Sequence, residues 1–316
     1  MRPKIPSRKR AVAVVGPGAI GGLLAATLRR CGRPVVLAAR GTSPLARDGA
    51  SLTVKDPGGR IWRATRFGIA GAAQSPREDL EAVFICVKSP DLAGAIASAR
   101  RLAGPRTAVV SLLNGLTHRA PLRRAFGPSR CVFGVAYFAA RRTGPASVWH
   151  TGGDLVTLAP TRANRAAALA ARRALSEAGW RVGLAPAEDR LLWTKAVFNA
   201  AINPLGALTR GTNAALAAHP ATRRLVTEVA AEAARIARAA GHPPLPGITA
   251  RGVLRSSRGM VHQYNSMVQD LEAGRKTESE ALLKPFVAAA RKTGVPARYI
   301  EPLYRMVRRL EKELSL

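Results

Sequence analysis

A lysine and two asparagines recur at helical spacing inside the apolar stretch WTKAVFNAAINPLGALT, residues 193–209. Because each residue of an α-helix turns by about 100°, Lys195, Asn199 and Asn203 fall on one stripe of the predicted helix. A helix that is apolar on all sides is normally buried, and a buried ammonium shifts its pKa or finds a partner. A lysine with a lowered pKa is suited to transfer a proton near working pH. The alternative is that Lys195 extends its ammonium to solvent.

A second pattern that indicates chemistry is the glycine turn GPGAIG, which lies between a β-branched apolar run and a helical pattern. Gly16 permits the tight turn, Gly18 lets the backbone approach a pyrophosphate, and Gly21 allows close packing of helix on strand. The amides that open the helix, including those of Ala19 and Ile20, would hold the anion. The context predicts a dinucleotide site, and the alternative is a glycine turn without a function.

The residue type after the second strand distinguishes NAD from NADP. The strand VVLAAR ends in Arg40, and no acidic residue follows before Asp48. An arginine here holds a 2′-phosphate, whereas NAD sites carry an acidic residue. The sequence therefore predicts NADPH/NADP+ as cofactor. Lys88 and Asn114 end two further strands and are expected at the same edge of the sheet, although either is also typical of a solvated strand end or a simple turn.

Candidate groups in the second half gather in residues 262–283. Ser266, Gln269 and Asp270 precede a Gly-Arg turn there, and Glu278 opens the next helical pattern. Thr277 followed by Glu280 has the spacing of a capping box, which predicts that these two side chains initiate the helix. The helix dipole alone explains an acid at Glu278, so the residues by themselves do not make it catalytic.

The elements that must position these groups indicate an α/β fold. Strand and helix patterns alternate from residue 11 and imply a parallel sheet, followed by a strand-rich stretch at 129–160, a helix at 162–179 and a strand at 181–184. From residue 187 the pattern is helical to the end, with breaks at 241–247 and 293–296. We expect a Rossmann-type parallel sheet domain over 1–185, with a basic arm at 1–10, and an all-helical substrate-binding and catalytic domain over 186–316. The lysine stripe is expected to face the cleft between them.

Composition narrows the classes of function. The 316-residue chain has a net charge of +31, which attracts polyanions. Its arginines are scattered along nearly every helical pattern, and no nucleic-acid-binding motif accompanies them, so no specific nucleic-acid partner is expected. The chain shows no apolar run long enough to span a membrane and no signal-peptide pattern, which favours the cytoplasm. Three widely spaced cysteines, Cys31, Cys86 and Cys131, predict neither disulfides nor a zinc site.

These motifs together resemble the ketopantoate reductase family, the 2-dehydropantoate 2-reductases that reduce a 2-oxo acid with NADPH on the route to pantothenate. The resemblance covers nearly the whole chain and rests on GPGAIG, VKS, LLNG, WTKAVFNAAINPLGALT and NSMVQDLEAGRKTE in that order. It implies that Lys195 is the general acid and Glu278 the acidic partner in the substrate pocket. It also implies substrate or cofactor contacts from Ser266, Asn114, Asn199 and Asn203.

The sequence departs from the family pattern after Glu278. The family usually continues with Ile-Asp and then Asn-Gly, where this chain has Ser279, Glu280, Leu283 and Lys284. These departures bear on ketopantoate as substrate more than on the reductase chemistry. Two other readings stay open: a reductase or dehydrogenase of another 2-oxo or β-hydroxy acid, and a non-catalytic NADP-binding protein. A homodimer is left open as the assembly.

Overall fold

The computed structural model describes residues 9–70, 79–246, 250–258 and 263–316. The chain divides into two compact units. One comprises residues 1–87, 91–113 and 120–186, and the other comprises 88–90, 114–119 and 187–316. Residues 1–8 of the expected basic arm lie outside the described residues, as does residue 262. Each unit has its own apolar core.

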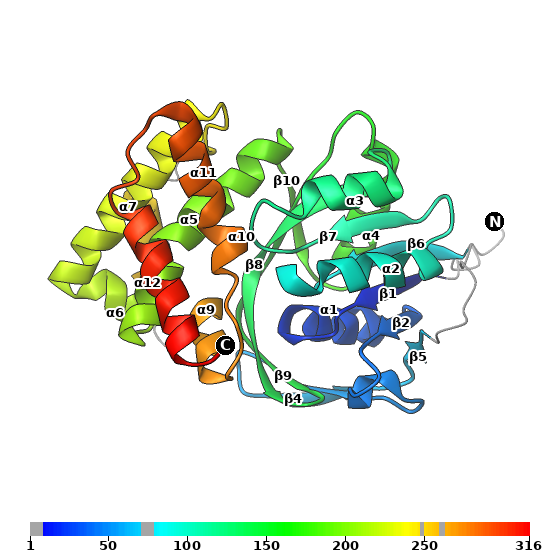
Figure 1. Ribbon diagram of the computed structural model, residues 1–316. Helices are drawn as coiled ribbons and strands as arrows, with labels where there is room; N and C mark the ends of the chain where they lie inside the picture. Colours follow the sequence, from blue (N-terminus) through cyan, green and yellow to red (C-terminus); the bar gives the residue numbers. More distant parts are fainter. Residues whose placement is uncertain (1–8, 71–78, 247–249, 259–262) are drawn as a thin grey trace. The chain divides into compact units, whose positions relative to one another are not determined.

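The first unit is built on a mixed sheet (Figure 1). The strand order is β4-β3-β9-β8-β7-β6-β1-β2-β5, with β10 paired to β9. The bounds are β1 Ala11–Val15, β2 Val35–Ala38, β3 Leu52–Lys55, β4 Ile61–Ala64, β5 Gly68–Ile69, β6 Leu80–Ile85, β7 Ala108–Ser111, β8 Cys131–Gly144, β9 Ser147–Ala159 and β10 Arg181–Leu184. The helices are α1 Ala19–Arg30, α2 Leu92–Leu102, α3 Arg119–Phe126 and α4 Arg165–Glu177, and short 3₁₀ turns span Pro44–Ala46 and Ser89–Asp91.

The expected parallel sheet is confirmed for its central part, where β2, β1, β6, β7 and β8 run parallel. The β8–β9 and β3–β4 pairs are antiparallel. Helix α1 contacts the central strand β1 and also β8 and β9, so the sheet curls around this helix. The parallel arrangement places the carboxyl ends of the central strands, and the loops that follow them, at one edge.

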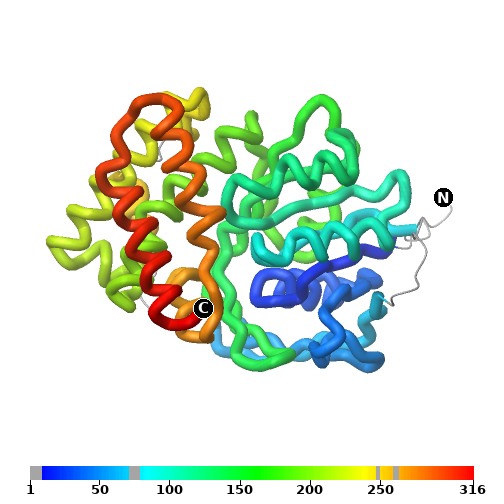
Figure 2. The backbone as a smooth tube through the Cα atoms, viewed as in Figure 1, coloured from blue at the N-terminus to red at the C-terminus, as the bar shows by residue number. Residues whose placement is uncertain are grey.

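The second unit is helical. Its helices are α5 Glu188–Thr209, α6 Asn213–Ala218, α7 Pro220–Ala239, α8 Ala250–Arg258, α9 Ser266–Glu272, α10 Ser279–Leu282, α11 Lys284–Thr293 and α12 Ile300–Glu313. Helices α11 and α12 lie side by side (Figure 2), and α12 also packs on α5 and α10. The expected fold class, a Rossmann-type sheet followed by a helical region, is thus confirmed.

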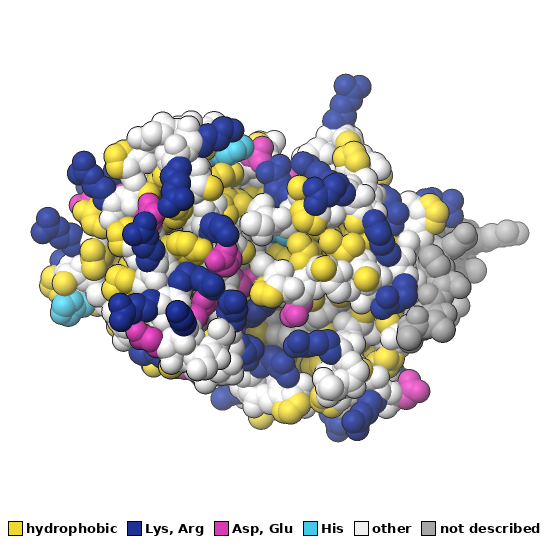
Figure 3. Space-filling view, viewed as in Figure 1, with side chains coloured by type: hydrophobic (Ala, Val, Ile, Leu, Met, Phe, Trp, Pro, Cys, Tyr) yellow, Lys and Arg dark blue, Asp and Glu magenta, His cyan; other side chains and the backbone are white. Residues whose placement is uncertain are grey.

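The basic side chains, the cysteines and the apolar helices can each be compared with what the composition predicts. Lys and Arg side chains are dispersed over the face seen in Figure 3 rather than gathered in one stripe. The three cysteines are free. Across the described part of the chain, no helix has the length and apolar character that crossing a membrane requires.

Candidate active site

The glycine turn of the first unit has the geometry that a pyrophosphate needs. Gly16 has φ +80°, and a Cβ there would lie 2.4 Å from Cγ1 of Val87. A Cβ on Gly21 would lie 2.3 Å from the carbonyl oxygen of Gly16, so both positions require glycine. A Cβ on Gly18 would meet nothing within 4 Å. Helix α1 begins at Ala19, and its first amides have no acceptor within the helix, so the turn offers donors beside open space.

Arg40 lies two residues beyond the end of β2. Its side chain is 82% exposed, and its guanidinium is 3.8 Å from the carboxylate of Asp91. An exposed pair of this kind is held weakly. The guanidinium can therefore turn to a phosphate at the strand end.

Helix α5 of the second unit carries the lysine stripe and is buried over most of its surface. Asn199 and Asn203 are buried, and Lys195 is half-buried. The Lys195 Nζ lies 5.0 Å from the centroid of the Phe198 ring. Burial lowers the pKa of Lys195 from 10.5 to about 8. The expected pKa shift is thus present, and the ammonium is poised to give up a proton near neutral pH.

The Asn-Gly pair after β7 contacts this helix. Nδ2 of Asn199 donates to Oδ1 of Asn114 at 3.5 Å. Gly115 has φ +86°, and a Cβ there would lie 2.7 Å from the carbonyl oxygen of Ala281 in α10. The turn is therefore fixed by its glycine and presses Asn114 against the helices of the second unit.

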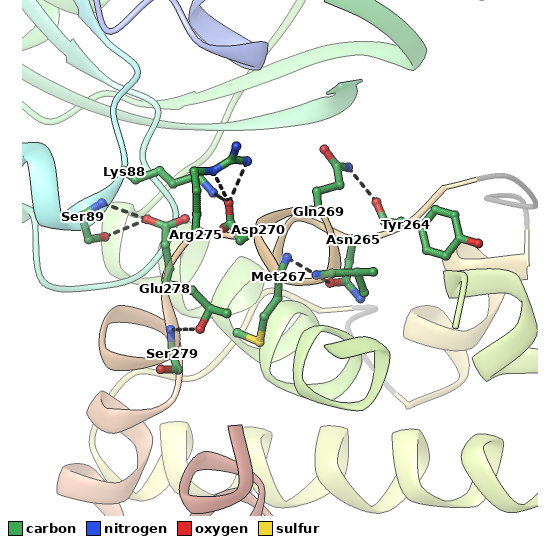
Figure 4. A network of polar contacts seen from close by, with 12 residues as sticks. Lys88, Ser89, Tyr264, Asn265, Met267, Gln269, Asp270, Arg275, Glu278 and Ser279 are labelled. Carbon is green, nitrogen blue, oxygen red and sulfur yellow. Dashed lines mark hydrogen bonds and ion pairs between the residues drawn. The ribbon is translucent and has the colours of Figure 1, made fainter. Parts of the chain in front are cut away.

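Glu278 is buried and held by the segment that follows β6 (Figure 4). Its Oε1 accepts two hydrogen bonds of 2.9 Å, one from the backbone N–H of Ser89 and one from the Ser89 hydroxyl. Burial raises the pKa of Glu278, and the Ser89 bonds and the charge of Lys88 oppose the rise. Ser89 was missed by sequence reasoning because it lies 189 positions from Glu278.

Lys88 is paired with an acid to which the sequence analysis assigned no role. Its ammonium contacts Oδ1 of Asp270, and that oxygen also accepts from Nη2 of Arg275 at 3.1 Å (Figure 4). Asp270 is buried, and its Oδ2 has no hydrogen-bond partner among the described residues. The pairing fixes the direction of Lys88.

Ser266 is the first residue of α9 and is half-buried. Asn265 caps this helix by accepting from the N–H groups of Met267 and Val268. Its amide donates to the carbonyl of Ile202 in α5 at 3.4 Å. The cap therefore fixes Ser266 relative to the asparagine stripe.

The predicted capping box is wrong. The hydroxyl of Thr277 accepts from the N–H of Ser279, not Glu280, at 3.2 Å. The Glu280 carboxylate instead accepts from the ammonium of Lys284 and from the hydroxyl of Tyr304. In a capping box the Thr277 N–H would donate to the Glu280 side chain. Here it donates to Glu311 of α12 at 2.9 Å. A buried carboxylate from a distant helix thus replaces the local partner.

The contacts join the predicted residues of the second unit into two groups. Asn114 contacts Asn199, which shares the stripe of α5 with Lys195 and Asn203. Lys88 joins Glu278, Ser89 and Asp270. The glycine turn and Arg40 belong to the other unit. Within the described residues, no cluster of three or more His, Cys, Asp or Glu side chains is arranged to hold a metal ion.

Comparison with known proteins decides the family. The model described as ketopantoate reductase PanE/ApbA matches residues 12–163, and its C-terminal counterpart matches residues 189–311. The 2-dehydropantoate 2-reductase of Halobacterium salinarum is 31% identical over 96% of this chain and 99% of its own length. The chain belongs to the ketopantoate reductase family. It is an oxidoreductase of this type.

Solved structures agree on the fold of this reductase. The PanE/ApbA family ketopantoate reductase of Ralstonia eutropha aligns with a TM-score of 0.82 and 26% identity, covering 97% of this chain and all of that one. D-mandelate dehydrogenase with NADH and anilino(oxo)acetate aligns with a TM-score of 0.86 over 97% of this chain and 99% of its own, at 22% identity. This second likeness concerns the fold alone.

Proposed function

We propose that this reductase converts 2-dehydropantoate (ketopantoate) to pantoate with NADPH, in the service of pantothenate biosynthesis. The observation that carries the proposal is Lys195 on the buried helix α5, whose pKa burial lowers to about 8. Such a lysine is still mostly charged at neutral pH and gives up its proton readily. The substrate is supported by the 2-dehydropantoate 2-reductase that matches this chain from end to end.

The residues of the second unit divide the work of reduction. When bound, the reduced nicotinamide supplies hydride to the carbonyl carbon. Lys195 donates its proton to the carbonyl oxygen as negative charge develops there, and then regains a proton from water. Asn199, held by Asn114 and one turn from Lys195, orients the ammonium or the oxygen. The product is a 2-hydroxy acid.

The remaining polar groups recognise the rest of the substrate. Ser266 donates its hydroxyl to the substrate carboxylate, and Asn203 binds from the same stripe as Lys195. Glu278, whose carboxylate is anchored on one oxygen by Ser89, accepts from the substrate hydroxyl. A site built around hydrogen bonds to a hydroxyl rejects analogues that lack it.

NADPH is the proposed form of the cofactor because Arg40 follows the second strand, at the position where NADP-binding domains bind the 2′-phosphate. The amides at Ala19 and Ile20 hold the pyrophosphate at the glycine turn. Lys88, directed by Asp270, and Asn114 complete the cofactor contacts. A homodimeric assembly and a place in the cytoplasm stay predictions.

The departures from the family pattern do not argue against ketopantoate. Ser279 is buried and turns its hydroxyl towards Glu311. Leu283 is part of the apolar core, and Lys284 is 62% exposed and bound to Glu280. Ser279 thus contacts another helix, Leu283 packs in the core, and Lys284 lies at the surface. Their surroundings support an unaltered substrate.

The test is NADPH oxidation with ketopantoate, with 2-oxoisovalerate, which lacks the hydroxyl, and with the aromatic oxo acid benzoylformate. We expect kcat/KM for ketopantoate to exceed that for 2-oxoisovalerate by as much as ~10⁴-fold. Comparable values for the first two would refute ketopantoate specificity and leave the reductase chemistry intact. Preference for benzoylformate would assign a mandelate-type reaction, and turnover of none of them would favour a non-catalytic NADP-binding protein.

A further inference from the structure

Glu311, near the end of α12, is a charged residue with only 1% of its surface exposed. Its Oε1 accepts from the N–H of Thr277 at 2.9 Å, from the Thr277 hydroxyl, and from the hydroxyl of Ser279 at 3.5 Å. Its Oε2 accepts from Arg308 at 2.7 Å. A carboxylate is kept in a protein interior only when hydrogen bonds or ion pairs compensate for the lost water. Here the donors to Oε1 come from the residues on either side of Glu278, and Arg308 compensates Oε2.

The donors also bind each other. The Thr277 hydroxyl donates a hydrogen bond to Glu311 and accepts one from the N–H of Ser279 at 3.2 Å. The backbone is therefore fastened immediately before and immediately after Glu278. With both neighbours fixed, the Cα–Cβ bond of Glu278 has one direction, and its carboxylate meets Ser89 of the distant segment.

The short helix α10 does not supply this anchoring by itself. It spans only Ser279–Leu282, and the residue that precedes it, Glu278, makes no side-chain cap. The capping box predicted from Thr277 and Glu280 is absent because Glu280 binds Lys284 and Tyr304. Glu311 of α12 holds the segment in its place.

We propose that Glu311 is a positioning residue for the reaction. It acts through Thr277 and Ser279 to hold the carboxylate of Glu278 in the orientation that substrate binding and turnover require. This inference rests on the proposed function, in which Glu278 contacts the substrate. Displacing a reacting group by about 1 Å can cost on the order of 10²-fold in rate.

The experiment is a double-mutant cycle on kcat and KM for 2-oxo acid reduction with Glu311→Gln, Glu278→Gln and both together. Gln keeps the size of Glu311 but weakens the hydrogen bonds that Glu311 accepts from the Thr277 N–H and from the hydroxyls of Thr277 and Ser279. We expect Glu311→Gln to lower kcat by about 10- to 100-fold. In the Glu278→Gln background it should cost less than about twofold, because the group it positions has already been changed.

The matched control is Glu313→Gln on the same helix, which removes an exposed carboxylate that binds only Arg309 among the described residues. Its kcat should equal that of the parent. Multiplicative losses in the double variant would overturn the proposal and make Glu311 a purely structural group. Normal turnover by Glu278→Gln would instead remove Glu278 from the proposed function, so the two failures are distinguishable.

A second pair of variants covers the case in which Glu311→Gln does not fold. Thr277→Val removes the hydroxyl that links Glu311 to Ser279, and Thr277→Ser keeps it. We expect kcat to fall for the valine variant and to be restored for the serine variant, with the KM for NADPH unchanged in both. Equal kcat in the two variants would contradict the relay.

Discussion

The glycine turn at residues 16–21 and the polar site of the second unit are built by opposite means. The turn uses backbone groups of one continuous segment, and what its sequence contributes is the absence of side chains at Gly16 and Gly21. The second site uses side chains from segments as far apart as Ser89 and Glu278, which are separated by 189 positions. One site is prepared by local conformation, and the other exists only after the helices have packed.

The energetics of the two regions differ in the same way. Amides at the start of a helix are available for a ligand without any burial of charge. The second site buries Glu278 and Asp270 and half-buries Lys195, and burial shifts the pKa of Lys195 and of Glu278 towards the neutral forms. We therefore expect that an exposed side chain of the nucleotide end such as Arg40 can be changed without loss of fold, whereas the charges of the second site cost stability.

The strongest test of the chemical end is Lys195→Ala. We expect kcat to fall by at least about 10²-fold, since general acid catalysis contributes ~10² to 10⁴. The Kd for NADPH, measured by fluorescence titration, should change little because Lys195 is not among the residues proposed to bind the cofactor. Lys292→Ala, at an exposed lysine of α11, is the control and should be unaffected. Near-normal turnover of Lys195→Ala would remove the general acid from the mechanism.

At the nucleotide end the corresponding test is Arg40→Asp. Replacing a guanidinium by a carboxylate removes a charge-assisted contact of ~1.5 to 3 kcal/mol, so NADPH should bind about 10- to 150-fold more weakly. Affinity for NADH and the melting temperature should stay as they are, which isothermal calorimetry and thermal unfolding can check. The same change at Arg60, an exposed residue beside β4, should have no such effect. Equal weakening of both cofactors would show that another residue reads the phosphate.

A smaller effect is expected from pH. For catalysis Lys195 must carry its proton, and its pKa is about 8. The kcat/KM of reduction should therefore be level below pH 8 and fall about tenfold per unit above it. The Kd for NADPH over the same range gives the control, because the proposed cofactor contacts do not include Lys195. A fall that begins well below pH 7 would mean that a different group limits the reaction.

What the sequence could predict follows this division. The glycine turn, the Lys195 stripe and the Asn114 turn depend on spacing within one segment, and the structure has the expected glycine geometry and lysine pKa. The positions of Ser89, Asp270 and Glu311 could not be predicted, because each acts on a residue far along the chain. The capping box failed for the same reason: the buried carboxylate of Glu311 binds Thr277 more effectively than the nearby Glu280, which turns outward to Lys284.

The smallest expected effect is on stability, and it tests the trade directly. In the folded protein the pKa of Lys195 is lowered from 10.5 to about 8, so below pH 8 the folded state carries a charge that its surroundings disfavour. Lys195→Met removes that charge and should raise the free energy of unfolding at pH 7 by up to about 3 kcal/mol. As pH rises from 8 towards 10.5, the lysine of the folded protein loses its proton while that of the unfolded chain keeps it, and the advantage of the variant should disappear.

Urea unfolding at several pH values measures the gain in stability and its loss with pH, with Lys292→Met expected to lie within about 0.5 kcal/mol of the parent. An inactive Lys195→Met variant that is no more stable than the parent would show that the site holds its ammonium without strain, and the contrast with the glycine turn would then be one of geometry alone.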